Sequence, residues 1–322
     1  MIHPVPPGTR DVLPDEMRDL RALTSRLYEV WDRAGYGEVR TPTLEYEDVL
    51  REGDARSAGA GFRTFDDHGQ VMALRTDATI PIARLVANRY SDSPGPIRLC
   101  YFEHAYRAVK VRSGQPREFL QAGLELIGAA APAGDAEIIA LTLQGLDAAG
   151  LRRHRLGLGD GSLYRTLLAE LDVPEPARAP LLESLARRDL VGIEAQAARL
   201  AVTPAARGLL VRLPQLRGGP DVLNRADGPV AAAVENLRGL YELLAERGVA
   251  DRVIFDLGLV RELGYYTGAV FEVYDPAVGF AVGGGGRYDE LLGRFGRPQP
   301  AVGIALDVHR VHVAQLEEER QP

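Results

Sequence analysis

The sequence offers very little cysteine or lysine chemistry. Among its 322 residues there is one cysteine, Cys100, and one lysine, Lys110. A single cysteine excludes an internal disulfide framework and a cluster of thiolate metal ligands, so we expect Cys100 to be a small buried hydrophobic residue. Lys110 is the only candidate for Schiff-base chemistry, and the cations around it make that role unfavourable.

Long hydrophobic runs and a basic N-terminal leader are also lacking. No apolar run approaches the roughly 18 residues that a membrane-spanning helix requires. Residues 1–16 contain no basic segment followed by an apolar one, so we expect a cytoplasmic protein without a signal peptide. The formal net charge of −7 is unfavourable for a dedicated nucleic-acid binder, although it leaves room for a local basic groove.

The motifs of several common sites are missing as well. The histidines show no metal-ligand spacing apart from His309 and His312, which no H-E-x-x-H motif supports, so we expect no metal site. No G-x-S-x-G motif indicates a serine hydrolase. Four consecutive glycines, residues 283–286, lack the spacing of a dinucleotide-binding loop. They indicate close approach by a ligand or, equally, a bulge or tight packing.

Periodicity and turn residues predict the individual elements. Apolar residues at helical spacing predict a helix over residues 15–34. Residues 37–46 read as one strand leading into a proline-marked turn, and residues 64–75 as a hairpin around His68 and Gly69. A further helix should follow Asp77, which is a candidate N-cap.

The order of these elements predicts an α+β fold, with an antiparallel sheet flanked by helices. Residues 97–109 and 117–128 read as long strands within that sheet. Residues 162–250 are rich in Ala, Leu and Arg with helical periodicity, and they predict a helical insertion. The core domain would then consist of residues 1–161 and 251–322.

A basic segment joins the two long strands. Residues 106–121 contain four cations, Arg107, Lys110, Arg112 and Arg117, around a Ser-Gly-Gln-Pro turn. The pattern predicts a hairpin with a basic tip, a shape suited to holding phosphate.

Two further groups of polar residues are candidates for a pocket. On a strand, Gln121, Gly123 and Glu125 would share one face, leaving room for a small polar ligand beside the glycine; a solvated strand face is the alternative. Tyr265 and Tyr266 would point to opposite faces if their segment is extended, one into the core and one into a pocket wall.

Taken together, the segments resemble the catalytic core of the class II histidyl-tRNA synthetases over nearly the whole chain. The resemblance rests on an N-terminal signature, motifs 1, 2 and 3, an amino-acid-recognition segment and two histidine-specific signatures. In chain order these are PPGTRDVLPDE, VRTPTLEY with Pro42 at the family's dimer interface, ALRTDATIPIAR, residues 106–121 with QAGLELIG, LVRELGYYTGAVFE, GGGRYDELL and AVGIALDVHR.

The resemblance implies a histidine pocket. Asp77, Thr79 and Gln121 would hold the α-amino group of histidine, and Arg261 would reach its carboxylate. Glu125 and Tyr266 would face the imidazole, with Tyr265 beside them. These groups suit the ligand, because carboxylates pair with an ammonium, arginine with a carboxylate, and Glu125 can accept an imidazole N–H.

The chain departs from the synthetase pattern where ATP would bind. Val109 replaces a glutamate of motif 2, Gln115 replaces a loop arginine, and Asp307-Val308-His309 replaces the Gly-Leu-Glu before Arg310. In one histidine-specific signature, Glu262 stands where the family has glycine and Gly264 stands where it has aspartate. Adenylation depends on preorganised groups that stabilise charge on the α-phosphate. We therefore expect adenylation to be lost and amino-acid binding kept, with Arg107 and Arg310 as a retained anion or nucleotide site.

The departures resemble those of one non-catalytic branch, the regulatory subunits of ATP phosphoribosyltransferase (HisZ). Only twelve residues follow Arg310, so we also expect no anticodon-binding domain. The resemblance implies no catalytic residue, cofactor, tRNA or membrane, a short-form catalytic subunit (HisG) as partner, histidine as effector, and a homodimer within a hetero-octamer. The alternatives are a residual histidine-adenylating enzyme (a truncated synthetase or an amino-acid ligase) and a binding partner in another pathway.

Overall fold

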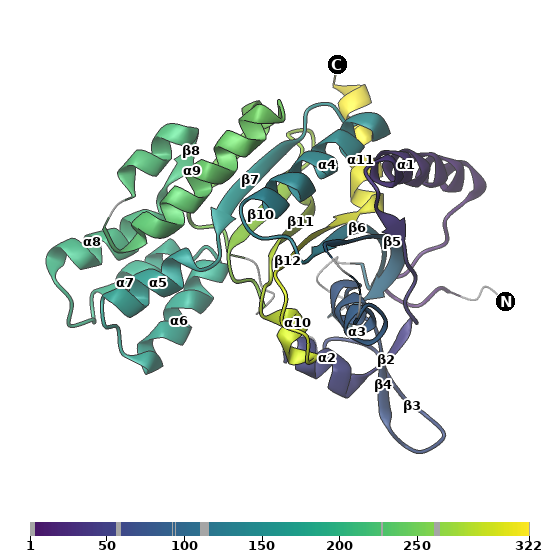
Figure 1. The fold of residues 1–322 in the computed structure, drawn as a ribbon, viewed down its shortest axis with the longest axis horizontal. Coiled ribbons are helices and arrows are strands. Elements are labelled where there is room, and N and C mark those ends of the chain that lie inside the picture. The colour runs from purple at the N-terminus through teal and green to yellow at the C-terminus, as the bar shows by residue number, and fades with distance from the viewer. Residues whose placement is uncertain are drawn as a thin grey trace.

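The centre of the structure is a large mixed β-sheet (Figure 1). The computed structural model describes residues 4–55, 59–91, 93, 95–109, 116–226, 228–260 and 265–321. Within these residues the sheet has nine strands in the order β1-β5-β6-β12-β11-β10-β7-β9-β8. In that order the strands are Gly37–Glu38, Ile97–Tyr106, Glu118–Ile127, Ala301–Asp307, Ala281–Arg287, Ala269–Tyr274, Arg155–Asp160, Val253–Asp256 and Arg217–Gly218.

The predicted antiparallel arrangement is confirmed in the middle of this sheet. From β5 to β7 in the spatial order, each strand runs antiparallel to its neighbour. Nearer the edges, β1 pairs with β5 and β7 pairs with β9 in parallel. The sheet is therefore mixed, and the α+β class is as predicted.

The two faces of the sheet are covered differently. Along β5, Ile97, Leu99 and Tyr101 belong to one buried cluster, whereas Cys100 belongs to the other, because successive side chains alternate between faces. Three helices cover the Cys100 face, namely α1 (Pro14–Arg33), α4 (Ala133–Ala149) and α11 (Val308–Arg320). The opposite face carries the cavity described below.

Helix α1 forms close to where the apolar spacing predicts it. Its buried residues Leu20, Leu23, Leu27 and Trp31 recur every three or four positions and make one apolar stripe. The stripe packs closely on α4 at Gly145, where a Cβ atom would lie 3.1 Å from Leu27 Cδ2. This packing fixes one outer layer of the fold.

A smaller sheet lies at the other end of the main body. It contains β2 (Leu44–Tyr46), β4 (Val71–Leu74) and β3 (Arg63–Phe65), with α2 (Glu47–Gly53), α3 (Thr79–Arg89) and α10 (Leu291–Arg294) beside it. The predicted hairpin is confirmed: Asp66 Oδ1 accepts hydrogen bonds from the amides of His68 and Gln70 at 2.9 and 2.8 Å.

Residues 37–46 were predicted as a strand that leads into a proline-marked turn, and the structure has a short strand, β1, before Pro42 and a second strand, β2, after it. β1 pairs with β5 of the large sheet, and β2 pairs with β4 of the small one. Between them the Glu103 carboxylate accepts hydrogen bonds from Thr41 N at 2.6 Å and from Thr41 Oγ1 at 2.9 Å. Thr41 is thereby held out of either ladder, and the chain passes from one sheet to the other.

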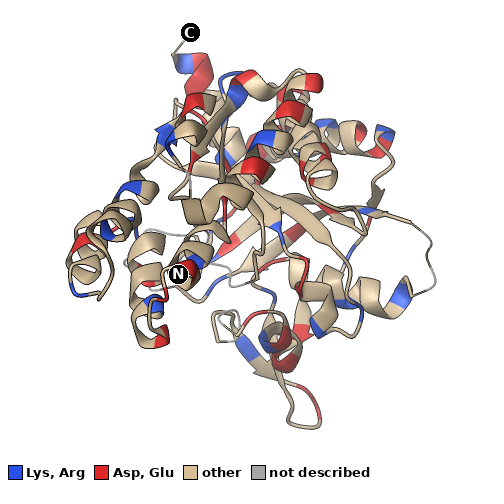
Figure 2. Ribbon diagram, turned by 60° about the vertical axis from the view of Figure 1, so that its left-hand side comes forward, with Lys and Arg blue, Asp and Glu red and all other residues tan. Residues whose placement is uncertain are grey.

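Most of residues 162–250 are helical, as predicted. The helices are α5 (Leu163–Glu170), α6 (Glu175–Ala186), α7 (Leu190–Ala197), α8 (Pro204–Arg212) and α9 (Ala231–Glu246). They lie together on the left in Figure 1. The two-residue β8 pairs with β9 and so ties this insertion to the large sheet. On the surface helices drawn in Figure 2, basic and acidic residues are interspersed.

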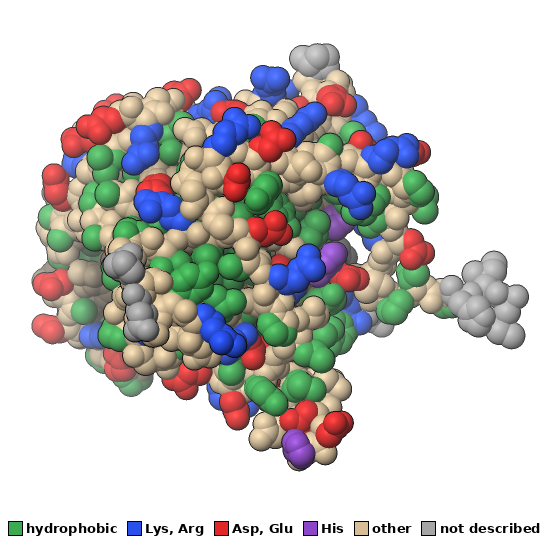
Figure 3. All heavy atoms as spheres, turned by 45° about the vertical axis from the view of Figure 1, so that its right-hand side comes forward, with side chains coloured by type: hydrophobic (Ala, Val, Ile, Leu, Met, Phe, Trp, Pro, Cys, Tyr) green, Lys and Arg blue, Asp and Glu red, His purple; other side chains and the backbone are tan. Residues whose placement is uncertain are grey.

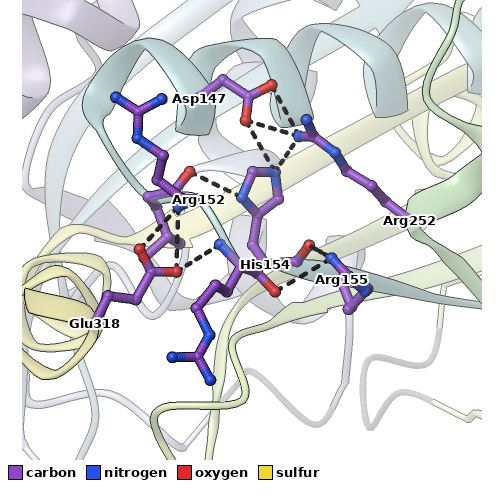
Figure 4. A network of polar contacts seen from close by, with 8 residues as sticks. Asp147, Arg152, His154, Arg155, Arg252 and Glu318 are labelled. Atoms are coloured by element: carbon purple, nitrogen blue, oxygen red, sulfur yellow. Dashed lines mark hydrogen bonds and ion pairs between the residues drawn. The ribbon is translucent and has the colours of Figure 1, made fainter. Parts of the chain in front are cut away.

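A polar network joins the C-terminal helix to the start of β7 (Figure 4). Glu318 of α11 accepts hydrogen bonds from the backbone amides of Arg152 and Arg153. Beside it, Arg252 contacts both Asp147 and His154 Nε2 at 2.8 Å. Burial, followed by the charge of Arg252, lowers the pKa of His154, so this histidine is a neutral structural residue. None of the described helices has the length and apolar character needed to cross a membrane.

Candidate functional site

A cavity of about 270 Å³ lies over β6, β12 and β11, on the face of the sheet opposite α1. It brings together most of the residues that the sequence assigned to a ligand pocket. Among its lining residues are Asp77, Thr79, Arg107, Phe119, Gln121, Tyr265, Tyr266, Glu272, Tyr288, Gly303, Asp307 and Arg310.

Glu125 lies beneath this cavity on β6. Only 1% of it is exposed. Its carboxylate accepts a hydrogen bond from Thr79 Oγ1 at 2.7 Å and another from the Tyr288 hydroxyl. Burial raises the pKa of Glu125 to about 8, despite these two bonds, which favour the ionised form. Burial therefore favours the protonated form of Glu125 at neutral pH.

The strand next to Glu125 has a glycine where the carboxylate needs space. Gly303 of β12 is directly opposite Glu125 in the antiparallel register. A Cβ atom at this position would overlap Glu125 Oε2. Glycine at position 303 therefore leaves space for the buried carboxylate of Glu125. Glycine within a strand often marks a place where another group approaches the backbone closely.

Asp77, Thr79 and Gln121 line the part of the cavity above Glu125, which we call the amino-acid half. Asp77 Oδ1 accepts a hydrogen bond from Ile80 N at 3.0 Å, so it caps α3 as predicted, although Ala78 is the residue directly before the helix. Burial raises the pKa of Asp77. Gln121 Oε1 is buried and finds no hydrogen-bond donor among the described residues, so the site presents an acceptor without its partner.

The tyrosines form one cluster, which corrects the sequence prediction. Tyr265 and Tyr266 were expected on opposite faces, but their ring centroids are 5.0 Å apart and both rings are buried. The reason is that β10 begins only at Ala269, so the two residues are not on an extended strand. Tyr288 packs edge-on against Tyr265 at 5.7 Å. Sequence reasoning gave Tyr288 no role.

Arg107 and Arg310 lie in the second half of the cavity, which we call the nucleotide half. The guanidinium of Arg107 lies 4.9 Å from the centroid of the Phe119 ring, and that of Arg310 lies 5.3 Å from the Phe280 ring. Arg310 Nη1 also donates to the Ala281 carbonyl at 2.9 Å. Both arginines meet aromatic rings of the same chain, at the geometry of cation–π contacts.

The base of the predicted basic hairpin is held in a similar way. Arg117 lies over the Phe62 ring, 4.6 Å from its centroid, and its amide donates to Gly8 O at 2.8 Å. The remaining hairpin residues 110–115, including the substituted position 115, lie outside the described residues. So does the segment 261–264, which contains the predicted carboxylate ligand Arg261.

The four-glycine run serves close packing rather than a dinucleotide loop. Cβ atoms at Gly283 and Gly285 would overlap β12, and one at Gly286 would lie 2.8 Å from the Tyr266 ring. The run lies inside β11 and not at its end. This outcome corresponds to the tight-packing alternative, while Gly283 and Gly284 also line the cavity.

A second cavity of about 270 Å³ adjoins the first and shares Glu272 and Ala281 with it. Its walls include Arg188 and Arg217 of the insertion, but none of the residues predicted to bind histidine. In the described part of the chain, no three His, Cys, Asp or Glu side chains gather closely enough to hold a metal ion.

The fold and the cavity correspond to a histidyl-tRNA synthetase-like protein. The family model for histidyl-tRNA synthetase matches residues 8–311. The crystal structure of an ATP phosphoribosyltransferase regulatory subunit/histidyl-tRNA synthetase from Bacillus halodurans C has a TM-score of 0.91 and 33% identity, over 98% of this chain and 84% of that one.

Curated relatives narrow the family further. An ATP phosphoribosyltransferase regulatory subunit of Desulforamulus reducens is 42% identical over 96% of this chain and 78% of that protein. A protein of the same name from Rubrobacter xylanophilus is 44% identical, over 98% of this chain and 77% of the relative. The chain belongs to the family of ATP phosphoribosyltransferase regulatory subunits.

Proposed function

We propose that the chain is the non-catalytic regulatory subunit of ATP phosphoribosyltransferase, required for activity and for histidine feedback in the first step of histidine biosynthesis. The relatives' shared name supports this role. The observation that carries it in the molecule is the contrast within one cavity. Gln121 Oε1 has no donor among the described residues and Glu125 lies close by, bonded to two hydroxyl groups, whereas Arg107 and Arg310 lie on rings of the chain.

Histidine is the effector that the amino-acid half fits best. Asp77 and Gln121 Oε1, which has no donor in the described part of the chain, are acceptors for an α-ammonium group. We propose that Glu125, which lies beneath the cavity beside Thr79, binds an imidazole nitrogen together with Tyr266 of the cavity wall. Arg261 stays our proposed partner for the carboxylate. With Val109 in place of a motif 2 glutamate, the cavity lacks a contact that adenylation would use.

The proposed assembly pairs this chain with the short-form catalytic subunit (HisG), as a homodimer within a hetero-octamer in the cytoplasm. The projecting hairpin and its neighbouring strand support a dimer surface. They expose Leu44, Tyr46 and Phe65, the last with 68% of its surface accessible, and Figure 3 shows hydrophobic side chains on this projection. Such grouped apolar side chains are typical of interaction sites. Light scattering that finds a monomer at micromolar concentration would contradict the dimer.

Reconstitution with the catalytic subunit tests the proposed function. We expect the catalytic subunit to form phosphoribosyl-ATP much faster when this chain is added, and we expect histidine to suppress the added rate. A matched control replaces this chain with an equal amount of an unrelated acidic protein. No change in rate on addition of the chain would refute the proposal.

The alternative is a residual histidine-adenylating enzyme, and Arg107 and Arg310 in the cavity are its best support. Val109 in place of a motif 2 glutamate and Asp307-Val308-His309 in place of Gly-Leu-Glu weigh against it. We also expect the chain not to bind tRNA. Affinity for nucleic acid depends on neutralisation of phosphates by basic residues, and the net charge of this chain is −7.

A further inference from the structure

The wall of the amino-acid half is also a contact surface of the helical insertion. The segment from Tyr265 to Gly268 presents the two tyrosine rings to the cavity. Its backbone faces the beginning of the insertion instead. Gly161 N donates to Gly268 O at 2.8 Å, and Arg165 Nη2 of α5 donates to Tyr266 O at 2.9 Å. A single residue, Tyr266, therefore touches the cavity and the first helix of the insertion.

The other side of the same segment is anchored to the main domain. Thr267 N donates to Arg287 O at 2.8 Å, and Asp289 N donates to Thr267 Oγ1 at 3.0 Å. Arg287 is itself buried in ion pairs with Asp135 and Asp289. The segment is thus fixed to a rigid strand on one side, and on its other side it meets a helix that belongs to the insertion.

Arg165 is well suited to respond to small shifts of this segment. Its guanidinium spans two carbonyl groups, Tyr266 O and, through Nε at 3.3 Å, Gly161 O. Hydrogen bonds from a charged donor are stronger than neutral ones and depend steeply on geometry. A ligand that orders the Tyr266 ring would therefore favour one position of α5 over others.

We propose that Arg165 is a positioning residue through which occupancy of the amino-acid half is transmitted to the helical insertion. The inference rests on the proposed function, since it takes histidine as the ligand. Beyond that function, it identifies the helical insertion as the part of the molecule that responds to bound histidine. Coupling between sites is reciprocal, so a partner that binds the insertion would alter histidine affinity by the same factor.

A second arginine provides a matched comparison. Arg188 also joins the insertion to the main domain, through an ion pair of 2.8 Å with the buried Asp256 of β9. Neither Arg188 nor Asp256 lines the cavity that contains the tyrosines. Loss of Arg188 should loosen the insertion without affecting the response to histidine, whereas loss of Arg165 should affect the response itself.

The experiment is amide hydrogen exchange of the full chain with and without saturating histidine, combined with calorimetric titration. In the wild type, histidine should slow exchange in α5 as well as in α3 and β6. In Arg165→Ala, histidine should bind roughly fivefold more weakly, at the low end of typical coupling between sites. At saturation, protection should then be confined to α3 and β6. Arg165→Lys should restore part of the α5 response, and Arg188→Ala should keep it.

The outcomes separate this inference from the proposed function. Wild type that binds histidine without slower exchange in α5 would overturn the role of Arg165 and leave the histidine pocket intact. The same is true if Arg165→Ala shows the wild-type response in α5 at saturation. Wild type that binds no histidine would refute the proposed effector, and with it this coupling.

Discussion

The two halves of one cavity differ in how their polar groups are satisfied. In the amino-acid half, Gln121 Oε1 is buried without a donor in the described chain, and Glu125 is buried between two hydroxyl groups. In the nucleotide half, Arg107 and Arg310 each lie on an aromatic ring, and Arg310 also reaches a backbone carbonyl. The first half therefore contains a buried acceptor without a donor in the described chain, whereas the two arginines of the second half lie against rings of the chain.

The difference is what we would expect if the synthetase fold has lost adenylation and kept amino-acid binding. Adenylation requires both halves at once, because the reacting carboxylate and the α-phosphate must meet with their charge stabilised. Binding of an amino acid requires only the first half. We therefore propose that a few substitutions around Arg107 and Arg310 separate catalysis from amino-acid binding in this cavity.

The largest loss of histidine affinity is expected from substitution of Glu125. Glu125→Ala removes a contact of about 1.5–3 kcal/mol between a ligand and a charged or strongly polar group. Histidine affinity should fall about ten- to a hundredfold, as measured by calorimetric titration of the chain alone. Glu194→Ala, which removes an exposed carboxylate from α7, is the matched control and should bind like wild type. Equal affinity of all three proteins would show that histidine binds elsewhere.

The raised pKa of Glu125 should also make the free energy of unfolding depend on pH. The pKa of Glu125 is about 8 when folded, against an ordinary value of 4.5. Between these two values the folded chain holds a proton that the unfolded chain has released, so the free energy of unfolding should fall as pH rises. Each pKa unit is worth about 1.4 kcal/mol. Glu125→Gln cannot ionise, and it should escape this loss.

Urea unfolding at about pH 5 and about pH 8 measures this difference. Wild type should lose roughly a few kcal/mol relative to Glu125→Gln over that interval. If the two proteins change in parallel, Glu125 is ionised in the folded state, and our description of the amino-acid half is wrong.

The smallest effect is expected in the nucleotide half. Arg310→Ala removes a cation whose described contacts include Phe280 and Ala281 O. Burial raises the pKa of Asp77 and the charge of Arg107 opposes that shift, so Arg107 is left unchanged in this test. Histidine affinity should change less than about threefold, within roughly 0.7 kcal/mol. A loss as large as that of Glu125→Ala would mean that the two halves act as one site.

Local patterns predicted much of the fold. Apolar spacing identified α1, and the long strands β5 and β6 follow from their composition and from the turn between them. The split between β1 and β2 was not predictable, because it depends on Glu103, which binds Thr41 from 62 positions away. A tertiary contact of this kind leaves no periodic pattern in the sequence.

Most of the residues proposed for the histidine site lie close together, while their role in binding stays a prediction. Asp77, Thr79, Gln121 and Tyr266 line one cavity, and Glu125 lies directly beneath it. Tyr288 was missed because its hydroxyl meets Glu125 across 163 positions of sequence. The contact between Arg310 and Phe280 was missed for the same reason, since the two residues are distant in the sequence. Phe119 is only twelve positions after Arg107, but no sequence motif indicates that the two side chains are in contact.

Histidine-dependent ATP–pyrophosphate exchange tests the central claim most directly, since it requires both halves of the cavity to work together. A histidyl-tRNA synthetase assayed under the same conditions provides the positive control. Our account predicts no exchange above background by this chain, at histidine concentrations that saturate it in calorimetry. Exchange at a rate comparable to that of the synthetase would contradict the account.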